Sequence, residues 1–449
     1  MADERLRALN RFGLGARVGE PARLADPRGW LRGQLEGDAR ITAGVPADSE
    51  ISGALQAFRR AGQGQDRDRQ EARRRIVTLA AAEQRAALTA RITTDRPFLE
   101  RLVAFWSNHL CVSAGAKIPV AALAGSYERQ VVRPHVLGKF EDMVLASAKH
   151  PAMLIYLDNL QSIGPNSRAA RMARGRQQRG LNENYARELL ELHTLGVDGG
   201  YTQADVTELA RLLTGWTLGG FGPRQRDSAE IEFQFVPLLH EPGAKTVVGA
   251  RYNDGVGEGE RAIRALCRHP STAKFVATKL VTHFVADAPP AAAVDRVAKV
   301  FAESSGDLRK VSLALVDLPE AWADSGTRKF RTPQDWIVAT LRSFNAREVG
   351  DPMLQTLRQL RHPLWSPQAP KGFGDMRQEW ADPDSLMNRA ELARNVARRI
   401  GRAGVDPRAL LEVMETAPDD PLRVMLGDGT IPVDERIALA IAGPAFQWR

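Results

Sequence analysis

The sequence predicts a mostly α-helical globular fold with one small β element. Apolar residues recur at i, i+3 and i+4 through most of the 449 residues, which is the spacing of amphipathic helices. A brief alternation of apolar and polar residues occurs at 231–250, where IEFQFVPLLH precedes Gly243 and the short run TVVG. We expect one small β-hairpin there, with long loops at 161–181 and 217–258.

The helical segments are expected to form one continuous large domain with three regions. These are an N-terminal helical region at 1–115, a central helical core with the β element at 116–350, and a C-terminal region at 351–449. The C-terminal region begins with a segment rich in Pro and Trp, 352–390, which predicts a loop. Helical periodicity then returns at 389–415 and at 434–442.

The composition is that of a soluble globular protein, with 43% hydrophobic and 26% charged residues. No apolar stretch approaches the roughly 20 residues that span a bilayer. The N-terminus shows no apolar segment of the kind found in signal peptides, so we expect a cytoplasmic location. Cys111 and Cys267 are far apart and indicate buried thiols in a reducing compartment, with a long-range disulfide as the alternative.

The net charge of +8 comes mainly from arginine and is concentrated in two segments, 59–75 and 168–179. Such segments can contact phosphate, sulfate or an anionic polymer. The alternative is a solvated helix for the first segment and an exposed loop for the second. The sequence argues against nucleic-acid binding, because stacking aromatic residues and base-reading motifs are missing.

The densest group of polar residues lies in the run NENYARELLELHTLGVDGGYTQADVTELARLLTGW, residues 182–216. At about 100° per residue, Arg187, Glu188 and Glu191 lie within roughly 60° of Asn184 on one helix face. Glu183, Arg187 and Glu191 also form a ladder of alternating charge, which stabilises a helix by about 0.2–0.5 kcal/mol per pair.

This polar helix face supports two interpretations. It can be a structural ladder, or Glu188 and Glu191 can act as acid and base or as metal ligands, with Arg187 orienting them. Oxygen ligands suit Mg, Ca or Mn better than Zn, so a divalent cation such as Mg or Ca would fit the second interpretation. In either case we expect the polar face to be mostly buried and hydrogen-bonded to other segments.

Further candidate site residues lie outside this face. His109 ends the aromatic motif FWSNH, and His240 and Lys245 flank a glycine turn; each can contribute to catalysis or binding, or be a hydrogen-bonded structural residue. The remaining candidates for substrate binding are Asn166, Asn182, Asn184 and Arg211.

Several motifs together resemble a known family. Besides the polar run, they are NRFG at 10–13, FWSNH at 105–109, HPAMLIYLDN at 150–159, HEPGAK at 240–245, HPSTAKFVATKL at 269–280 and the closing ERIALAIAGPAFQWR. Over essentially the whole chain they resemble the bacterial domain-of-unknown-function family numbered 1800. The resemblance implies a mostly helical bacterial protein and does not assign an activity. The family pattern more often has Asp where this chain has Glu241.

The resemblance also implies a partner. Members of this family are often encoded beside a family numbered 1501, which is similar to alkaline phosphatases and sulfatases and usually has a twin-arginine export signal. Export bound to such a partner, and hence a periplasmic location, is the alternative to a cytoplasmic one.

Two functions from different classes follow from these observations. The first is a hydrolase-type enzyme that uses carboxylate, Arg and His side chains, with or without a metal, on an anionic or saccharide-like substrate. In it Glu188, Glu191 and Arg187 work with His109 or His240, and Arg211 holds an anionic group. The second is a non-catalytic assembly or chaperone partner of an exported phosphatase- or sulfatase-like protein, in which the polar helix is a structural network.

Overall fold

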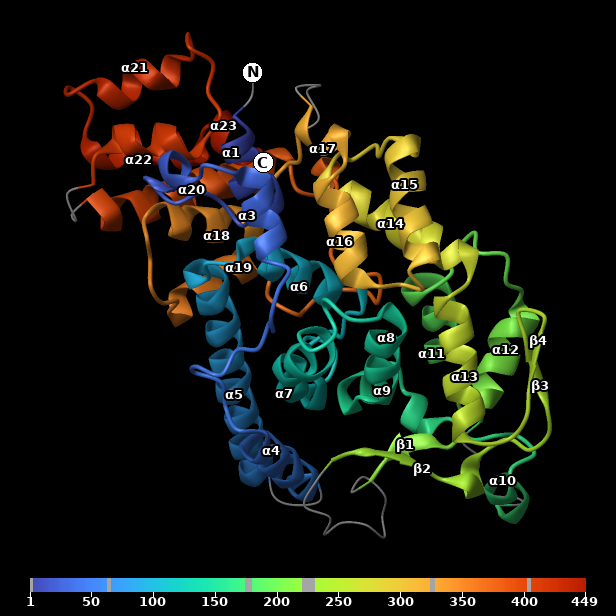
Figure 1. Ribbon diagram of the computed structural model, residues 1–449. Helices are drawn as coiled ribbons and strands as arrows, with labels where there is room; N and C mark the ends of the chain where they lie inside the picture. Colours follow the sequence, from blue (N-terminus) through green and yellow to red (C-terminus); the bar gives the residue numbers. More distant parts are fainter. Residues whose placement is uncertain (1–2, 63–65, 174–179, 220–230, 324–327, 402–404) are drawn as a thin grey trace.

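The computed structural model describes residues 3–62, 66–173, 180–219, 231–323, 328–401 and 405–449 (Figure 1). It is 61% helical, and the strands of the described residues form two small two-stranded sheets. The predicted mostly α fold is therefore confirmed. One connected cluster of buried apolar side chains extends from Leu6 to Phe446. The boundaries of the three regions stay a prediction.

The N-terminal helices surround one buried central helix, α6 (Pro97–His109). Helix α6 begins with Pro97 at its first position, where the missing N–H costs no hydrogen bond. The long helix α5 (Asp66–Thr93) packs against α4 (Asp48–Ala61) and α7 (Ile118–Tyr127). A π-helical turn, η2 (Glu128–Val132), continues α7 and contacts α6. Helices α8 (Phe140–Lys149) and α9 (Pro151–Tyr156) complete this half.

The polar run forms two helices that lie at the side of the molecule (Figure 1). Helix α11 (Asn184–Glu188) passes into a π-helical turn, η4 (Leu189–His193), and α12 (Gln203–Leu212) packs back on α11. Thr202 caps α12 through the N–H of Asp205, as the sequence predicts. Helices α13 (Val256–Cys267), α14 (Pro270–Phe284), α15 (Ala291–Glu303) and α16 (Leu308–Val316) follow.

The β region at 231–250 is present, but its predicted single hairpin is wrong. Strand β2 (Phe233–Phe235) pairs with β1 (Trp216–Leu218), whereas β3 (Lys245–Val247) pairs with β4 (Ala250–Tyr252). The turn between β3 and β4 is Val248-Gly249, both with positive φ, which matches the twist of a two-residue hairpin. Asp205 accepts a hydrogen bond of 2.6 Å from the Val248 N–H and so holds this turn against α12.

The C-terminal region packs beside the N-terminal helices (Figure 1). The predicted loop at 352–390 is only partly a loop, because α19 (Asp351–Gln359) and the start of α20 (Pro383–Gly401) lie within it. Helix α20 packs on α22 (Val433–Ala442), and α18 (Pro333–Ser343) lies next to α5. The remaining short helices are α1 (Glu4–Arg7), η1 (Ala8–Phe12), α2 (Glu20–Arg23), α3 (Pro27–Gly33), η3 (Asn159–Gln161), α10 (Arg168–Met172), η5 (Pro237–Leu239), α17 (Pro319–Trp322), η6 (Arg377–Glu379), η7 (Pro407–Val413), α21 (Pro421–Gly427) and α23 (Pro444–Gln447).

One buried carboxylate joins several of these elements. The Glu128 side chain, 1% exposed, accepts hydrogen bonds from Arg133, Arg91, Ser107 and Trp365 at distances of 2.8–3.3 Å. Burial raises the pKa of Glu128, but the charges of Arg133 and Arg91 together with its hydrogen bonds lower the pKa by a larger amount, so that the net shift is downward. The carboxylate therefore stays ionised inside the protein.

We predict that Glu128→Gln lowers the free energy of unfolding by about 3–5 kcal/mol at pH 7, because the arginines lose the charge that compensates them. Chemical denaturation of the wild type and the variant measures this. Because the pKa of Glu128 is lowered in the folded state, its carboxylate contributes fully to the free energy of unfolding above its ordinary pKa of 4.5. This contribution is lost as the pH falls through the folded-state pKa. Glu71→Gln, on the exposed face of α5, is the matched control and should change stability by less than about 0.5 kcal/mol. Equal effects of the two substitutions would contradict the prediction.

Candidate functional site

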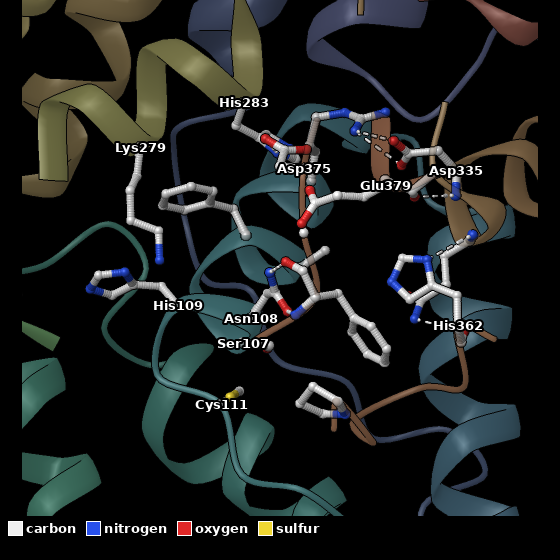
Figure 2. Close-up of a pocket in the computed structure, with 18 of the residues that line it drawn as sticks. Ser107, Asn108, His109, Cys111, Lys279, His283, Asp335, His362, Asp375 and Glu379 are labelled. Carbon is white, nitrogen blue, oxygen red and sulfur yellow. Dashed lines mark hydrogen bonds and ion pairs between the residues drawn. The ribbon is translucent and has the colours of Figure 1, made fainter. Parts of the chain in front are cut away.

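A cavity of about 410 Å³, here called the central cavity, is lined by the residues that Figure 2 shows. It is enclosed by the end of α6, one face of α14, the start of α18 and residues 362–379, here called the cavity loop. Its wall is mostly apolar and includes Leu14, Phe105 and Val338. Many polar and charged side chains also line the cavity, although most of its wall area is apolar. Polar groups placed in a mostly apolar cavity of this size are the usual form of a small-molecule site.

The motif FWSNH fixes the geometry of the cavity wall. Ser107 donates to Glu128 at 2.9 Å. Asn108 binds the backbone of Phe373 twice, donating to its carbonyl and accepting from its N–H, each at 2.8 Å. His109 donates from Nε2 to the carbonyl of His193 at 3.1 Å. Ser107 and Asn108 therefore hold the structure in place, and Asn108 attaches the cavity loop to α6.

Two glycines allow the cavity loop to approach its neighbours. Gly372 has φ +82°, and a Cβ there would lie 2.5 Å from the carbonyl oxygen of Asn108. A Cβ on Gly374 would lie within 2 Å of the Glu379 carboxylate, so a side chain at this position would displace Glu379. The sequence GFGD thus places Asp375 and Glu379 at the cavity.

His283 and Asp375 form a histidine–carboxylate pair at the cavity. Asp375 Oδ2 accepts from His283 Nδ1 at 3.0 Å, which leaves Nε2 as the acceptor nitrogen of the neutral ring. His283 Nε2 is buried and has no hydrogen-bond partner among the described residues. Burial lowers the pKa of His283, and Asp375 raises it by less, so the imidazole is neutral at pH 7.

Asp375 is held in its ionised form. Burial raises its pKa, but His283, Lys329 and Arg449 lower it more, to about 2. Asp335, the other buried carboxylate of the wall, is neutralised by Arg101 at 3.1 Å and by Arg449 at 3.2 Å. Asp335 is therefore part of the frame, whereas Asp375 orients a histidine.

Lys279 is a cationic group that extends into the cavity from α14, one helical turn before His283 (Figure 2). Arg91, Arg101 and Lys371 also line the cavity. Within the described residues the Lys279 ammonium makes no ion pair or hydrogen bond, and the Phe275 ring centre lies 5.6 Å away. Burial lowers the pKa of Lys279 to about 8. Figure 2 shows the side chain directed toward His109.

The histidines beside Lys279 are neutral. Burial, followed by the charge of Lys279, lowers the pKa of His109 well below its ordinary value and that of His193 to about 3. His109 Nδ1 is buried without a hydrogen-bond partner in the described part of the chain. Burial also raises the pKa of the nearby Cys111 thiol to about 12. None of these three groups carries a negative charge that could compensate the ammonium.

The polar helix face is not the buried network that the sequence predicts. Asn184 is exposed, and Glu183, Arg187, Glu188 and Glu191 are only half-buried. The apolar flank of α11 provides the buried contacts, and the polar face meets α12 at the surface. Glu183 accepts from Gln203 at 2.8 Å and from Thr207 at 2.6 Å, and Arg187 donates to Glu183 at 3.3 Å.

Glu188 and Glu191 do not line the central cavity. Glu191 accepts a hydrogen bond of 3.4 Å from Tyr201, whereas Glu188 has no hydrogen bond or ion pair with the described residues. Burial, and then the charge of Glu191, raises the pKa of Glu188. Their predicted catalytic roles with Arg187 stay a hypothesis. Neither glutamate lines the cavity that His109 lines.

The motif HEPGAK forms a separate buried cluster. His240 binds the Thr214 carbonyl at 2.8 Å, and Lys245 donates to Asp254 at 3.0 Å and to the Glu241 carbonyl. The Glu241 carboxylate accepts from both nitrogens of Asn166 at 2.7 Å. The structure thus brings together the predicted residues His240, Lys245 and Asn166, with their hydrogen-bonding groups directed at one another.

The last two predicted binding residues have local roles. Asn182 accepts from the Asn184 N–H at 2.9 Å and donates to the Asp158 carbonyl at 3.2 Å, which fixes the start of α11. Arg211 pairs with Glu208 at 2.6 Å on the same helix. Of the ten predicted site residues, one, His109, is among the residues that line the central cavity.

Sequence reasoning missed Lys279, His283, Asp375 and Glu379. Lys279 and His283 lie four residues apart in an otherwise apolar stretch of α14, a spacing that places both on one helix face. Asp375 follows the glycine pair of a loop, where functional residues are common. These two patterns could have indicated the site.

The described residues contain no group of three or more His, Cys, Asp or Glu side chains arranged to hold a metal ion. A divalent cation therefore stays a prediction without a ligand set in this part of the chain. Cys111 and Cys267 are both buried and free, so the disulfide alternative is wrong.

A family model described as "Protein of unknown function (DUF1800)" matches residues 7–447. The chain belongs to this family. The match confirms the whole-chain resemblance that the motifs indicate. Comparison with curated proteins and with solved structures gave no significant match. In the described part of this DUF1800 chain, no helix combines the length and apolar character needed to cross a bilayer.

We predict that Glu188→Gln leaves the stability of the DUF1800 chain at pH 7 unchanged or raises it by up to about 1 kcal/mol. The raised pKa means that the native state disfavours the ionised carboxyl, and the amide removes its repulsion with Glu191. Glu183→Gln is the contrasting variant. It weakens two hydrogen bonds and should lower stability by about 0.5–1.5 kcal/mol. Urea unfolding of both variants decides the matter, and a large loss for Glu188→Gln would refute a surface role.

We also predict that Lys279→Met raises the free energy of unfolding at pH 7 by about 1–3 kcal/mol, at 1.36 kcal/mol per unit of pKa shift. The lowered pKa means that the charged ammonium destabilises the native state. This penalty is complete below pH 8 and fades as the pH rises from about 8 to the ordinary value of 10.5. The gain should therefore shrink at pH 10. Lys274→Met, on the exposed face of α14, is the control, and a loss of stability in Lys279→Met alone would contradict the prediction.

Proposed function

We propose that this chain is a hydrolase-type enzyme whose active site is the central cavity and whose substrate is a small anionic molecule. The observation that carries the proposal is the arrangement on α14. A histidine oriented by a carboxylate and an ammonium without a counter-ion lie one turn apart and line the same apolar cavity. The mostly apolar wall favours an anionic molecule with an apolar body over a saccharide.

The proposed general base is His283. Its Nε2 takes a proton from a water molecule, whose oxygen attacks the substrate carbonyl, and the imidazolium returns that proton to the leaving group. Asp375 accepts the Nδ1–H bond, fixes the tautomer and stabilises the imidazolium. Asp375 is thus a positioning residue. The Lys329 ammonium donates to the backbone carbonyl of Asp375 at 2.7 Å and so holds this residue in place.

Two features support His283 over the other histidines of the wall. His362 stacks on Trp380 with ring centres 4.6 Å apart, and burial lowers its pKa to about 3. His109 donates to a backbone carbonyl and makes no contact with a carboxylate among the described residues. Both His109 and His283 have a buried ring nitrogen without a partner in the described part of the chain, but only at His283 does a carboxylate bind the opposite ring nitrogen and so orient the free one.

The test is hydrolysis of a panel of chromogenic esters, amides, phosphate esters and sulfate esters. We predict that His283→Ala lowers kcat/KM of the substrate that is cleaved by about 100-fold or more. Asp375→Asn should also lower it, and His135→Ala, on a surface turn away from the cavity, should not. Since burial lowers the pKa of His283, activity should rise with pH through a pKa below 6.5. Full activity of a folded His283→Ala variant, or no hydrolysis across the panel, would overturn the proposal.

The alternative of a non-catalytic assembly partner stays a prediction. It depends on the arginine-rich segment 168–179, of which residues 174–179 lie outside the described residues. The partner from the family numbered 1501, the location in the cytoplasm or periplasm, and the divalent cation likewise stay predictions.

A further inference from the structure

We propose that Lys279 is the anion-binding group of the central cavity and that the ligand is a singly charged organic acid of the carboxylate class. The carboxylate would lie against the ammonium, and an apolar body would lie along the apolar wall. This inference rests on the same site as the proposed function and names its substrate class.

The first argument is the contrast between Lys279, which is half-buried at the cavity, and the two buried lysines of the described residues, Lys329 and Lys245. Lys329 is paired with Asp287 and Asp375, and Lys245 with Asp254. Lys279 makes no such pair within the described residues. A charge removed from water without a partner is costly, and proteins ordinarily avoid it. A ligand that supplies the missing negative charge would remove this cost when it binds.

The second argument is that nothing around the ammonium competes for it. His109 and His193 are neutral because burial lowers their pKa values, and the Cys111 thiol stays protonated. Asp375, which also lines the cavity, is already engaged by His283 and Lys329. The part of the cavity beside Lys279 therefore has a positive charge that the neighbouring described side chains leave uncompensated.

The third argument concerns the size of the ligand charge. One ammonium compensates one negative charge, and Glu379 adds a negative side chain elsewhere on the wall. A dianionic phosphate would place its second charge where the other cations of the wall are already paired or are exposed to solvent. Arg91 is paired with Glu128 and Arg101 with Asp335, and Lys371 is exposed. A carboxylate matches the single charge and can accept from the rotating donors of a lysine.

The fourth argument is the spacing of the two groups on α14. Residues four apart on a helix have Cβ atoms about 5–6 Å apart. If Lys279 binds the carboxylate of a substrate, the bond that faces His283 therefore lies a few covalent bonds along the molecule from that carboxylate. A hydrophobic acid that also contains an ester or amide carbonyl has this layout.

The binding experiment uses 3-phenylpropionate, its amide and phenyl phosphate as probes in isothermal titration of the full chain. We expect the carboxylate to bind at least tenfold more tightly than the neutral amide and more tightly than the phosphate. Lys279→Met should abolish the preference for the carboxylate, Lys279→Arg should retain part of it, and Lys274→Met should leave it unchanged. Equal binding of acid and amide by the wild type, or an unchanged preference in Lys279→Met, would overturn the inference.

The pH dependence gives a second readout. Affinity for the carboxylate should be constant between about pH 6 and 7, where the ligand is ionised, and decline as the pH rises through about 8, because the free ammonium loses its proton there. The amide should show no such decline. Melting of each variant establishes that it is folded, so a lost preference is not a lost structure.

The two proposals fail in different ways. Carboxylate binding that depends on Lys279, without hydrolysis of any substrate, would leave this inference standing and remove the proposed enzyme. Hydrolysis that depends on His283 but is equal for neutral and anionic substrates, and unchanged in Lys279→Met, would do the reverse.

Discussion

The buried carboxylate of Glu128 is the interaction on which the central cavity depends. It accepts hydrogen bonds from Arg91 on α5, Ser107 on α6 and Trp365 in the cavity loop, all of which line the cavity, and from Arg133. Glu128 lies at the start of the π-helical turn η2, an irregularity that shifts side chains relative to a regular helix and is frequent near functional sites. Because the donors come from four segments, the wall is held open by charge and hydrogen bonds rather than by apolar packing.

The buried charges fall into two groups with different consequences. Glu128, Asp335 and Lys329 each meet opposite charges, and together they join the C-terminus at Arg449 to α6, α14 and α18. Such pairs fix positions, because removing one partner strands the other. Lys279 differs from them, since its ammonium points into the cavity with no described counter-ion. Even the buried Arg331 and Arg389, which form no ion pair with the described residues, donate to neighbouring oxygens, whereas the Lys279 ammonium has no such acceptor among those residues. This difference makes Lys279 informative about a ligand.

The sequence predicted the fold better than the site, for a physical reason. Helical periodicity is local, so the helices, the Thr202 cap and the β region could be read from short windows. The cavity brings together α6, α14, α18 and the cavity loop, which are far apart along the chain, and only His109 of the predicted residues lies there. The polar residues around Glu188 attracted attention by their density, yet their helix lies at the surface with α12. The four-residue spacing of Lys279 and His283 is visible in the sequence. That the ammonium and the ring Nε2 lack a partner among the described residues is not visible there, because it depends on distant segments.

The apolar wall sets the protonation states of both groups on α14 by one mechanism. Removing a side chain from water disfavours its charged form, which lowers the pKa of His283 and that of Lys279, the latter to about 8. A base must be neutral and an anion-binding group must be charged for the proposed chemistry. Both conditions hold between the lowered pKa of the histidine and that of the lysine, a window that includes neutral pH. Phe105, which packs 5.3 Å from the His283 ring and lines the cavity, contributes to this burial. The same apolar surface that accommodates the ligand therefore also prepares the two groups that would act on it.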